Sequence, residues 1–94
     1  MDFSFEWDPR KAVGNRRKHG VAFEEAIPVF GAPLARIFHD PDHSGSESRE
    51  IIIGHCARGR LLVVSFVQRG DRIRIFSARR ATRQERRDYE EGTS

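Results

Sequence analysis

A cationic stretch near the end of the chain carries the residue types best suited to chemistry on a phosphate. Residues 68–80 alternate arginine with apolar residues and then run into an arginine-rich segment. Residues 57–87 hold ten arginines against two acids, Asp71 and Glu85, which is a net charge of +8 in a chain of formal net charge +3. The chain has 15 arginines and 2 lysines, and a guanidinium offers a phosphate a rigid fork of N–H donors. This concentration predicts RNA or DNA as a partner.

The alternation also predicts how these cations are presented. In an extended strand Arg72 and Arg74 share one face while Ile73 and Ile75 take the other, so the strand buries one side and offers guanidinium on the other. For any single arginine a solvated surface charge explains the pattern equally well. For the cluster, nucleic-acid contact is the better interpretation.

The composition limits the fold to one small domain. The 94 residues are 37% hydrophobic and 33% charged, which predicts a single domain over residues 1–94 with a modest core. No run reaches the ~18–20 apolar residues of a membrane span, and the single cysteine, Cys56, has no intrachain disulfide partner. We therefore expect no membrane association and a cytoplasmic location.

The elements of the first third are marked by turn and capping residues. The alternation of Phe3, Phe5 and Trp7 predicts a short strand, and Asp8 before Pro9 predicts the start of a helix over residues 10–19 that ends at Gly20. A second helix is predicted over residues 21–30, with a kink or an early end at Pro28.

The rest of the chain predicts a sheet. Strands are expected over residues 34–40, 50–56, 60–67 and 72–77, the last three forming an antiparallel meander, and residues 40–48 form a polar, mobile loop. The run Thr82-Arg83-Gln84-Glu85 is a capping box that opens a last helix through about residue 90. The predicted class is α+β, with helices packed on a small antiparallel β-sheet.

Several of these motifs, in this order, resemble those of the BrnT toxins, the toxic halves of type II toxin–antitoxin pairs. The resemblance covers nearly the whole chain. Its N-terminal part is carried by Phe5-Glu6-Trp7-Asp8, Lys11, Asn15, Lys18-His19-Gly20-Val21 and Phe23-Glu24-Glu25-Ala26. Its C-terminal part is carried by Arg69-Gly70-Asp71, Arg74-Ile75, Ser77-Ala78-Arg79, Ala81, Glu85-Arg86 and Tyr89. Pro28 departs from the family pattern, and so does the early end of the chain after Tyr89.

The resemblance implies a RelE-like fold and cleavage of RNA, without metal or other cofactor, that blocks translation. It also implies a BrnA-type antitoxin as partner, with operator DNA bound only through the toxin–antitoxin complex. Metal-free RNA cleavage needs a base for the ribose 2′-hydroxyl, cations for the negative charge that develops on the phosphorane, and an acid for the leaving oxygen. The expected catalytic residues are His19, Arg69, Arg79 and Tyr89. The expected RNA-binding residues are Lys18, Arg72, Arg74, Arg80 and Arg83.

Alternatives exist for each assignment. His19 also suits a helix C-terminus, where it would interact with the dipole, and a lone tyrosine such as Tyr89 commonly packs in a core. His39, His43, His55 and Cys56 lack a zinc-site spacing, so we predict no metal site. For the whole chain, the alternatives are a non-catalytic nucleic-acid-binding or co-repressor module and an interaction subunit that binds an acidic partner.

Overall fold

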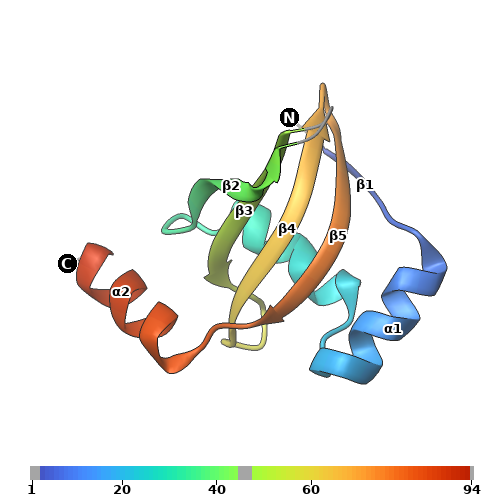
Figure 1. Cartoon of the computed structure of the whole chain (residues 1–94). Coiled ribbons are helices and arrows are strands. Elements are labelled where there is room, and N and C mark those ends of the chain that lie inside the picture. The colour runs from blue at the N-terminus through green and yellow to red at the C-terminus, as the bar shows by residue number, and fades with distance from the viewer. Residues whose placement is uncertain (1–2, 45–47, 94) are drawn as a thin grey trace.

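The computed structural model describes residues 3–44 and 48–93 and has the predicted α+β class. Along the chain the elements are β1 (Ser4–Glu6), α1 (Pro9–His19), the 3₁₀ helix η1 (Phe23–Gly31), β2 (Arg36–Ser44), β3 (Ser48–His55), β4 (Leu61–Arg69), β5 (Arg72–Arg80) and α2 (Arg83–Thr93). The strands form one sheet in the order β1-β5-β4-β3-β2. In Figure 1 the cyan η1 passes behind the strands, α1 lies beside β5, and α2 stands away from both.

The sheet is mixed because β1 pairs with β5 in parallel. Strands β2 to β5 form an antiparallel meander, as predicted for the last three, whereas Phe5 aligns with Ile73 in a parallel pair. A parallel pair needs a long crossover, and here the rest of the chain supplies it. Nothing local to the sequence marks this pairing.

Helix α1 begins and ends at the residues that the sequence indicates. The Asp8 carboxylate accepts a hydrogen bond from the backbone N–H of Arg10 at 2.8 Å, and Pro9 opens the helix. Gly20 follows the last turn with φ of 69°, a left-handed conformation that glycine adopts without steric cost. Its N–H donates to the carbonyl of Arg16 at 2.8 Å. Both predicted caps are confirmed.

The expected early end of the second helix is wrong. The segment Phe23–Gly31 is a 3₁₀ helix that continues past Pro28 for three further residues. Its inner face buries Phe23, Ala26 and Val29, at a spacing of three residues that matches the three-residue turn. The buried residues hold this tighter helix against the sheet. The helix therefore tolerates the loss of the one hydrogen bond that proline cannot donate.

Several strand ends also differ from the prediction. Strand β2 runs from Arg36 to Ser44, so part of the predicted loop over residues 40–48 is strand, and residues 45–47 lie outside the described residues. The β2–β3 register shifts between His39 and Ser44. Pro41 lies within this irregular stretch of an edge strand, a position where proline is tolerated. Strand β5 likewise extends to Arg80 rather than ending at residue 77.

The two faces of the sheet differ in what covers them. On the inner face Leu62, Val64 and Phe66 of β4 are at most 1% exposed and pack with the buried residues of η1. On the opposite face, which we call the open face, Leu61 and Val63 pack only with a smaller cluster that includes Tyr89 of α2. The candidate site lies on the open face.

Asn15 joins α1 to the sheet by forming the backbone hydrogen bonds that a neighbouring strand would otherwise form with β5. Beyond β1, the edge of β5 at Ala78 is paired by the Asn15 side chain, which accepts from the Ala78 N–H at 3.0 Å and donates to the Ala78 carbonyl at 2.7 Å. The same amide donates to the carbonyl of Val21 at 2.9 Å, and Asn15 is 8% exposed. One side chain therefore satisfies three backbone groups.

Candidate nucleic-acid interface

A bulge in β5 brings the arginines of this strand to one face. Ser77 pairs with Ser65 and Ile75 pairs with Phe66, so Phe76 is an extra residue between them. A bulge of one residue reverses the inward–outward alternation. As predicted, Ile73 and Ile75 are buried and Arg72 and Arg74 are exposed. After the bulge the odd-numbered Arg79 lies on the same open face as the even-numbered Arg74.

Two adjoining hollows lie on the open face. The first, of about 400 Å³, we call the polar hollow, and it is lined by Lys11, Asp40, Arg49, Ile51, Val63, Ser65, Phe76, Ser77 and Arg79. The second, of about 320 Å³, we call the apolar hollow, and it is lined by Arg36, Phe38, His39, Ile51, Ile53, Val63, Arg79, Glu85, Asp88 and Tyr89. Arg79 lines both, together with Ile51 and Val63, so the two form one continuous cleft.

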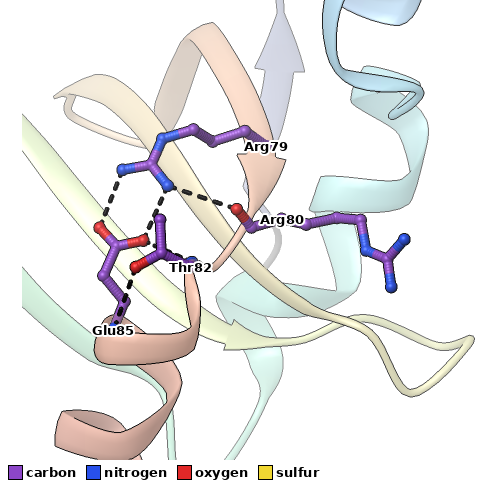
Figure 2. Close-up of polar contacts among 4 residues, drawn as sticks. All are labelled: Arg79, Arg80, Thr82 and Glu85. Atoms are coloured by element: carbon purple, nitrogen blue, oxygen red, sulfur yellow. Dashed lines mark hydrogen bonds and ion pairs between the residues drawn. The ribbon is translucent and has the colours of Figure 1, made fainter.

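Arg79 is held by a bidentate ion pair with Glu85. The two guanidinium nitrogens donate to the two carboxylate oxygens at 2.8 and 2.9 Å, and one of them also donates to the carbonyl of Arg80 at 3.3 Å (Figure 2). Glu85 in turn closes the predicted capping box, accepting from the Thr82 N–H at 2.8 Å while its own N–H donates to the Thr82 hydroxyl at 3.1 Å. The start of α2 therefore orients the arginine at the end of β5.

This pair makes the stability of the fold depend on pH. Hydrogen bonds from Arg79, then from the Thr82 backbone, lower the pKa of Glu85 from 4.5 to about 2. The stabilisation is therefore fully present above pH 4.5 and is lost as the pH falls towards 2. At neutral pH, Glu85→Gln is expected to lower the free energy of unfolding by about 1 kcal/mol, because a pair one third exposed is screened by water.

Thermal unfolding from pH 2 to pH 7 measures this effect. The gap in melting temperature between the wild type and Glu85→Gln should close as the pH falls below 4.5. Glu24→Gln, which removes an exposed carboxylate of η1, is the matched control and should follow the wild type. A gap that stays constant down to pH 2 would contradict the account of Glu85.

The polar hollow gathers cations from three elements. Lys11 comes from α1, Arg49 from β3 and Arg79 from β5, and Ser65 and Ser77 line the same hollow. The Arg49 guanidinium carbon lies 4.0 Å from the centroid of the Phe76 ring, and the Lys11 ammonium lies 5.3 Å from the same centroid. Such cation–π contacts restrain both side chains. The Asp40 carboxylate, 6% exposed, is the acid of this hollow.

His19 lies at the end of α1, within electrostatic reach of Arg79 but outside the residues that line the two hollows. Burial, followed by the charges of Lys18 and Arg79, lowers the pKa of His19 below 6.5. The lowered pKa favours the neutral imidazole, which is the form that accepts a proton.

The predicted arginines divide into two groups, one near each end of β5. Arg69, Arg72 and Arg74 surround a small hollow with Val67 and Glu6, away from Arg79. Arg74 forms an ion pair with Glu6 at 2.9 Å, and Arg72 approaches the same carboxylate at 3.7 Å.

The sequence suggested few acids near these cations, yet the fold supplies them. Acids distant in sequence or on α2 pair with arginines of the basic segment: Glu25 with Arg58 and Arg60, Glu6 with Arg72 and Arg74, and Glu85 with Arg79. The effective positive charge of the surface is therefore smaller than the sequence count of +8 suggests.

Tyr89 fixes α2 to the sheet. It is 6% exposed, its hydroxyl donates to the carbonyl of Leu34 at 3.0 Å, and its ring meets that of His55 edge-on at 5.7 Å between centroids. Arg36 of β2 also donates to the carbonyl of Gly92 near the end of α2. The ring lines the apolar hollow, but the hydroxyl is already engaged as a donor.

The remaining predicted residues lie outside both hollows. Lys18, Arg80 and Arg83 are exposed, and Figure 2 shows the Arg80 side chain pointing away from the Arg79–Glu85 pair. Among the described residues no group of three or more His, Cys, Asp or Glu side chains could hold a metal ion. Cys56 is buried, as expected for a small apolar residue, and the side chain of His43 lies outside what the structure describes.

Sequence reasoning missed several residues of the cleft. Lys11 and Ser77 were part of the motifs that carry the family resemblance, but no role followed from their position. Arg49 and Ser65 come from β3 and β4 and carry no local signal, because only the pairing of those strands places them beside Arg79.

The fold and the cleft together define a small α+β domain with a cationic, partly apolar groove on one sheet face. Residues 7–85 match the family model described as "Ribonuclease toxin, BrnT, of type II toxin-antitoxin system", and the chain belongs to this family. Membership implies an RNA target and an antitoxin partner.

One solved structure supports the same fold. The 1.1 Å crystal structure of the Brucella abortus ribonuclease toxin BrnT superposes with a TM-score of 0.68, at 24% sequence identity, over 86% of this chain and 99% of that one. A comparison with curated proteins gives no significant match. The helices of the described residues are not long and apolar enough to cross a membrane.

Proposed function

We propose that this chain is a metal-independent endoribonuclease toxin that cleaves RNA in the cleft of the open face, and that a BrnA-type antitoxin neutralises it. The observation that carries the proposal is the convergence of Lys11, Arg49 and Arg79 on the polar hollow, in a chain of a ribonuclease-toxin family. Operator DNA is bound only through the antitoxin complex. The protein acts in the cytoplasm, where its RNA substrate is found.

The proposed reaction is an intramolecular transesterification of the RNA backbone. The ribose 2′-oxygen attacks the adjacent phosphorus, the bond from phosphorus to the 5′-oxygen breaks, and a 2′,3′-cyclic phosphate and a 5′-hydroxyl result. One proton leaves the 2′-hydroxyl and one reaches the leaving oxygen. Arg79, with Lys11 and Arg49, stabilises the charge that develops on the phosphoryl oxygens. Because Arg79 is already oriented by Glu85, little reorganisation is needed when the phosphate binds.

Arg69, Arg72 and Arg74 bind flanking phosphates along the same sheet face. Their distance from Arg79 along β5 suits a strand of RNA that crosses the sheet rather than a single phosphate. Contacts of this kind are weakened by salt and insensitive to base sequence. Lys18, Arg80 and Arg83 lie farther from the cleft and contribute to the general attraction of RNA.

His19 does not line the hollows but lies within electrostatic reach of Arg79, and it is the proposed general base for the ribose of RNA bound at Arg79. Its protonation then sets a pH dependence. Because the pKa of His19 is lowered from 6.5, kcat/KM for RNA cleavage should rise with pH through a value below 6.5 and then level off. In His19→Gln the rising limb should disappear and the rate should fall about 10²- to 10⁴-fold. If the limb persists in that variant, another group is the base. Tyr89, whose hydroxyl already donates to Leu34, is a weaker choice for the acid.

Expression in cells tests the proposed function as a whole. The chain is expressed briefly, alone and together with the neighbouring open reading frame, while growth and total RNA integrity are followed. Growth arrest with fragmented RNA, both relieved by the neighbouring gene product, is expected. Normal growth with intact RNA would overturn the proposal, and RNA that is bound but never cut would favour a non-catalytic binding module.

A further inference from the structure

The apolar hollow has no role in the phosphate chemistry. It lies between the open face and α2, and its walls are the side chains of Phe38, Ile51, Ile53, Val63 and Tyr89. Helix α2 closes one side and is fixed there at three points, by the Arg79–Glu85 pair, by the hydroxyl of Tyr89 and by the bond from Arg36 to Gly92. At about 320 Å³ the hollow falls at the lower end of the roughly 300–1,000 Å³ of small-molecule sites.

An exposed aromatic ring stands at its edge. Phe38 is 51% exposed although it is a large apolar residue. It lies opposite Ile51 in the β2–β3 register and therefore on the open face, whereas its neighbour Ile37 pairs with Ile52 and faces the other way. Exposed aromatic rings beside a cationic groove are platforms on which the bases of single-stranded RNA stack.

The position of Arg79 links this hollow to the phosphate site. Arg79, Ile51 and Val63 line both hollows, so a group held in one is a direct neighbour of a group held in the other. A nucleotide has this layout, with a charged phosphate and an apolar-faced base separated by one ribose. We propose that the apolar hollow binds the nucleobase attached to the phosphate in the polar hollow, stacked on Phe38. This inference rests on the proposed function, since it assumes that RNA occupies the cleft.

The acids at the rim indicate which base fits. Two acids line the hollow. Both oxygens of Glu85 accept hydrogen bonds from Arg79, and Glu85 also accepts from the Thr82 backbone, so Glu85 is already engaged. The other acid is Asp88, one of whose oxygens accepts from the Gln84 side chain at 2.9 Å, and Asp88 is the carboxylate that we assign to the base. A carboxylate accepts hydrogen bonds from base amino and imino groups. Guanine presents two such donors side by side, whereas uracil flanks its single N–H with two carbonyls, so the hollow favours guanine over uracil.

Binding of uncleavable RNA tests this proposal. Short 2′-O-methyl oligonucleotides, one all uridine and one with a single central guanosine, are titrated with the wild type, Phe38→Ala, Ile37→Ala and Asp88→Asn by fluorescence anisotropy. The wild type should prefer the guanosine oligonucleotide. Phe38→Ala should weaken its binding by about fivefold to 150-fold, the range measured for stacked bases. Ile37→Ala, an equally exposed apolar residue facing the other way, should change it by less than about twofold. Asp88→Asn should remove the preference for guanosine, and, because it takes a negative charge out of the cleft, it should not weaken binding of the uridine oligonucleotide.

The outcomes separate this inference from the proposed function. Unmodified RNA is incubated with the same proteins, and thermal melting confirms that each is folded. If the wild type cleaves RNA but Phe38→Ala and Ile37→Ala bind alike, or if no guanosine preference is found, the base site is wrong and the ribonuclease activity stands. If the wild type neither binds nor cleaves RNA, both proposals fail. Asp88 is exposed on α2, so Asp88→Asn is expected to stay folded. Its effect on the guanosine preference therefore tests the base site even if Phe38→Ala unfolds.

Discussion

Replacing Arg79 with alanine is expected to lower the rate of RNA cleavage about 10²- to 10³-fold, the cost of removing one preorganised donor to a charged transition state. Arg79 is the only cation that lines both hollows of the open face among the described residues. It is also held in place by two hydrogen bonds to Glu85. In cells the variant should no longer arrest growth. The rate constant for cleavage of a labelled RNA by purified protein measures the effect.

Two further variants separate geometry from charge. Arg79→Lys keeps the positive charge but not the bidentate fork, so it should recover less than about a tenth of the lost activity. Arg17→Ala removes one positive charge from an exposed position of α1, away from the cleft, and should retain nearly full activity. Equal losses in Arg79→Ala and Arg17→Ala would mean that net charge, rather than a site at Arg79, governs the activity.

Replacing Asn15 with alanine is expected to destabilise the fold strongly. The variant leaves the Ala78 N–H, the Ala78 carbonyl and the Val21 carbonyl without their partner in a buried position. Unsatisfied buried groups cost about 1–3 kcal/mol each, and partial relaxation brings the total to roughly 3 kcal/mol. For a domain of this size that corresponds to a fall in melting temperature of roughly 10–20 °C.

Two variants show whether the amide acts in this way. Asn15→Asp keeps an acceptor for the Ala78 N–H but turns a carboxylate towards two carbonyl oxygens, so it should be destabilised at least as much at neutral pH. Gln84→Ala removes an amide whose bond to Asp88 lies on the surface of α2, and should change stability by less than about 0.5 kcal/mol. A melting temperature of Asn15→Ala within a few degrees of the wild type would contradict the role of Asn15.

The elements that local signals define were predictable from the sequence. Both caps of α1, the antiparallel meander and the capping box of Thr82 and Glu85 are all confirmed, because each depends on residues only a few positions apart. The predicted early end at Pro28 was wrong because the prediction assumed an α-helix. The buried residues of η1 repeat every three positions, which is the period of a 3₁₀ helix. The end of β2 was missed because a proline in an edge strand looks the same in sequence as one in a loop.

The site was predictable only in part, because its geometry comes from long-range pairing. The alternation of Arg72 and Arg74 was read correctly, but the bulge at Phe76 that returns Arg79 to the same face has no signature in the sequence. Arg49 reaches the cleft only through the pairing of β3 with β4, and Glu6 reaches Arg74 only through the parallel β1–β5 pair. The family resemblance pointed to Arg79 without supplying its partner Glu85.

The central claim is that the open face cleaves RNA through Arg79, and the ends of the cleaved RNA test it most directly. Purified wild type and Arg79→Ala are incubated with labelled messenger RNA, both free in solution with EDTA and bound to ribosomes, and the new ends are analysed. The account predicts fragments that carry 2′,3′-cyclic phosphate and 5′-hydroxyl ends with the wild type, and intact RNA with Arg79→Ala. RNA that stays intact with the wild type in both settings, or fragments that Arg79→Ala produces equally well, would contradict it.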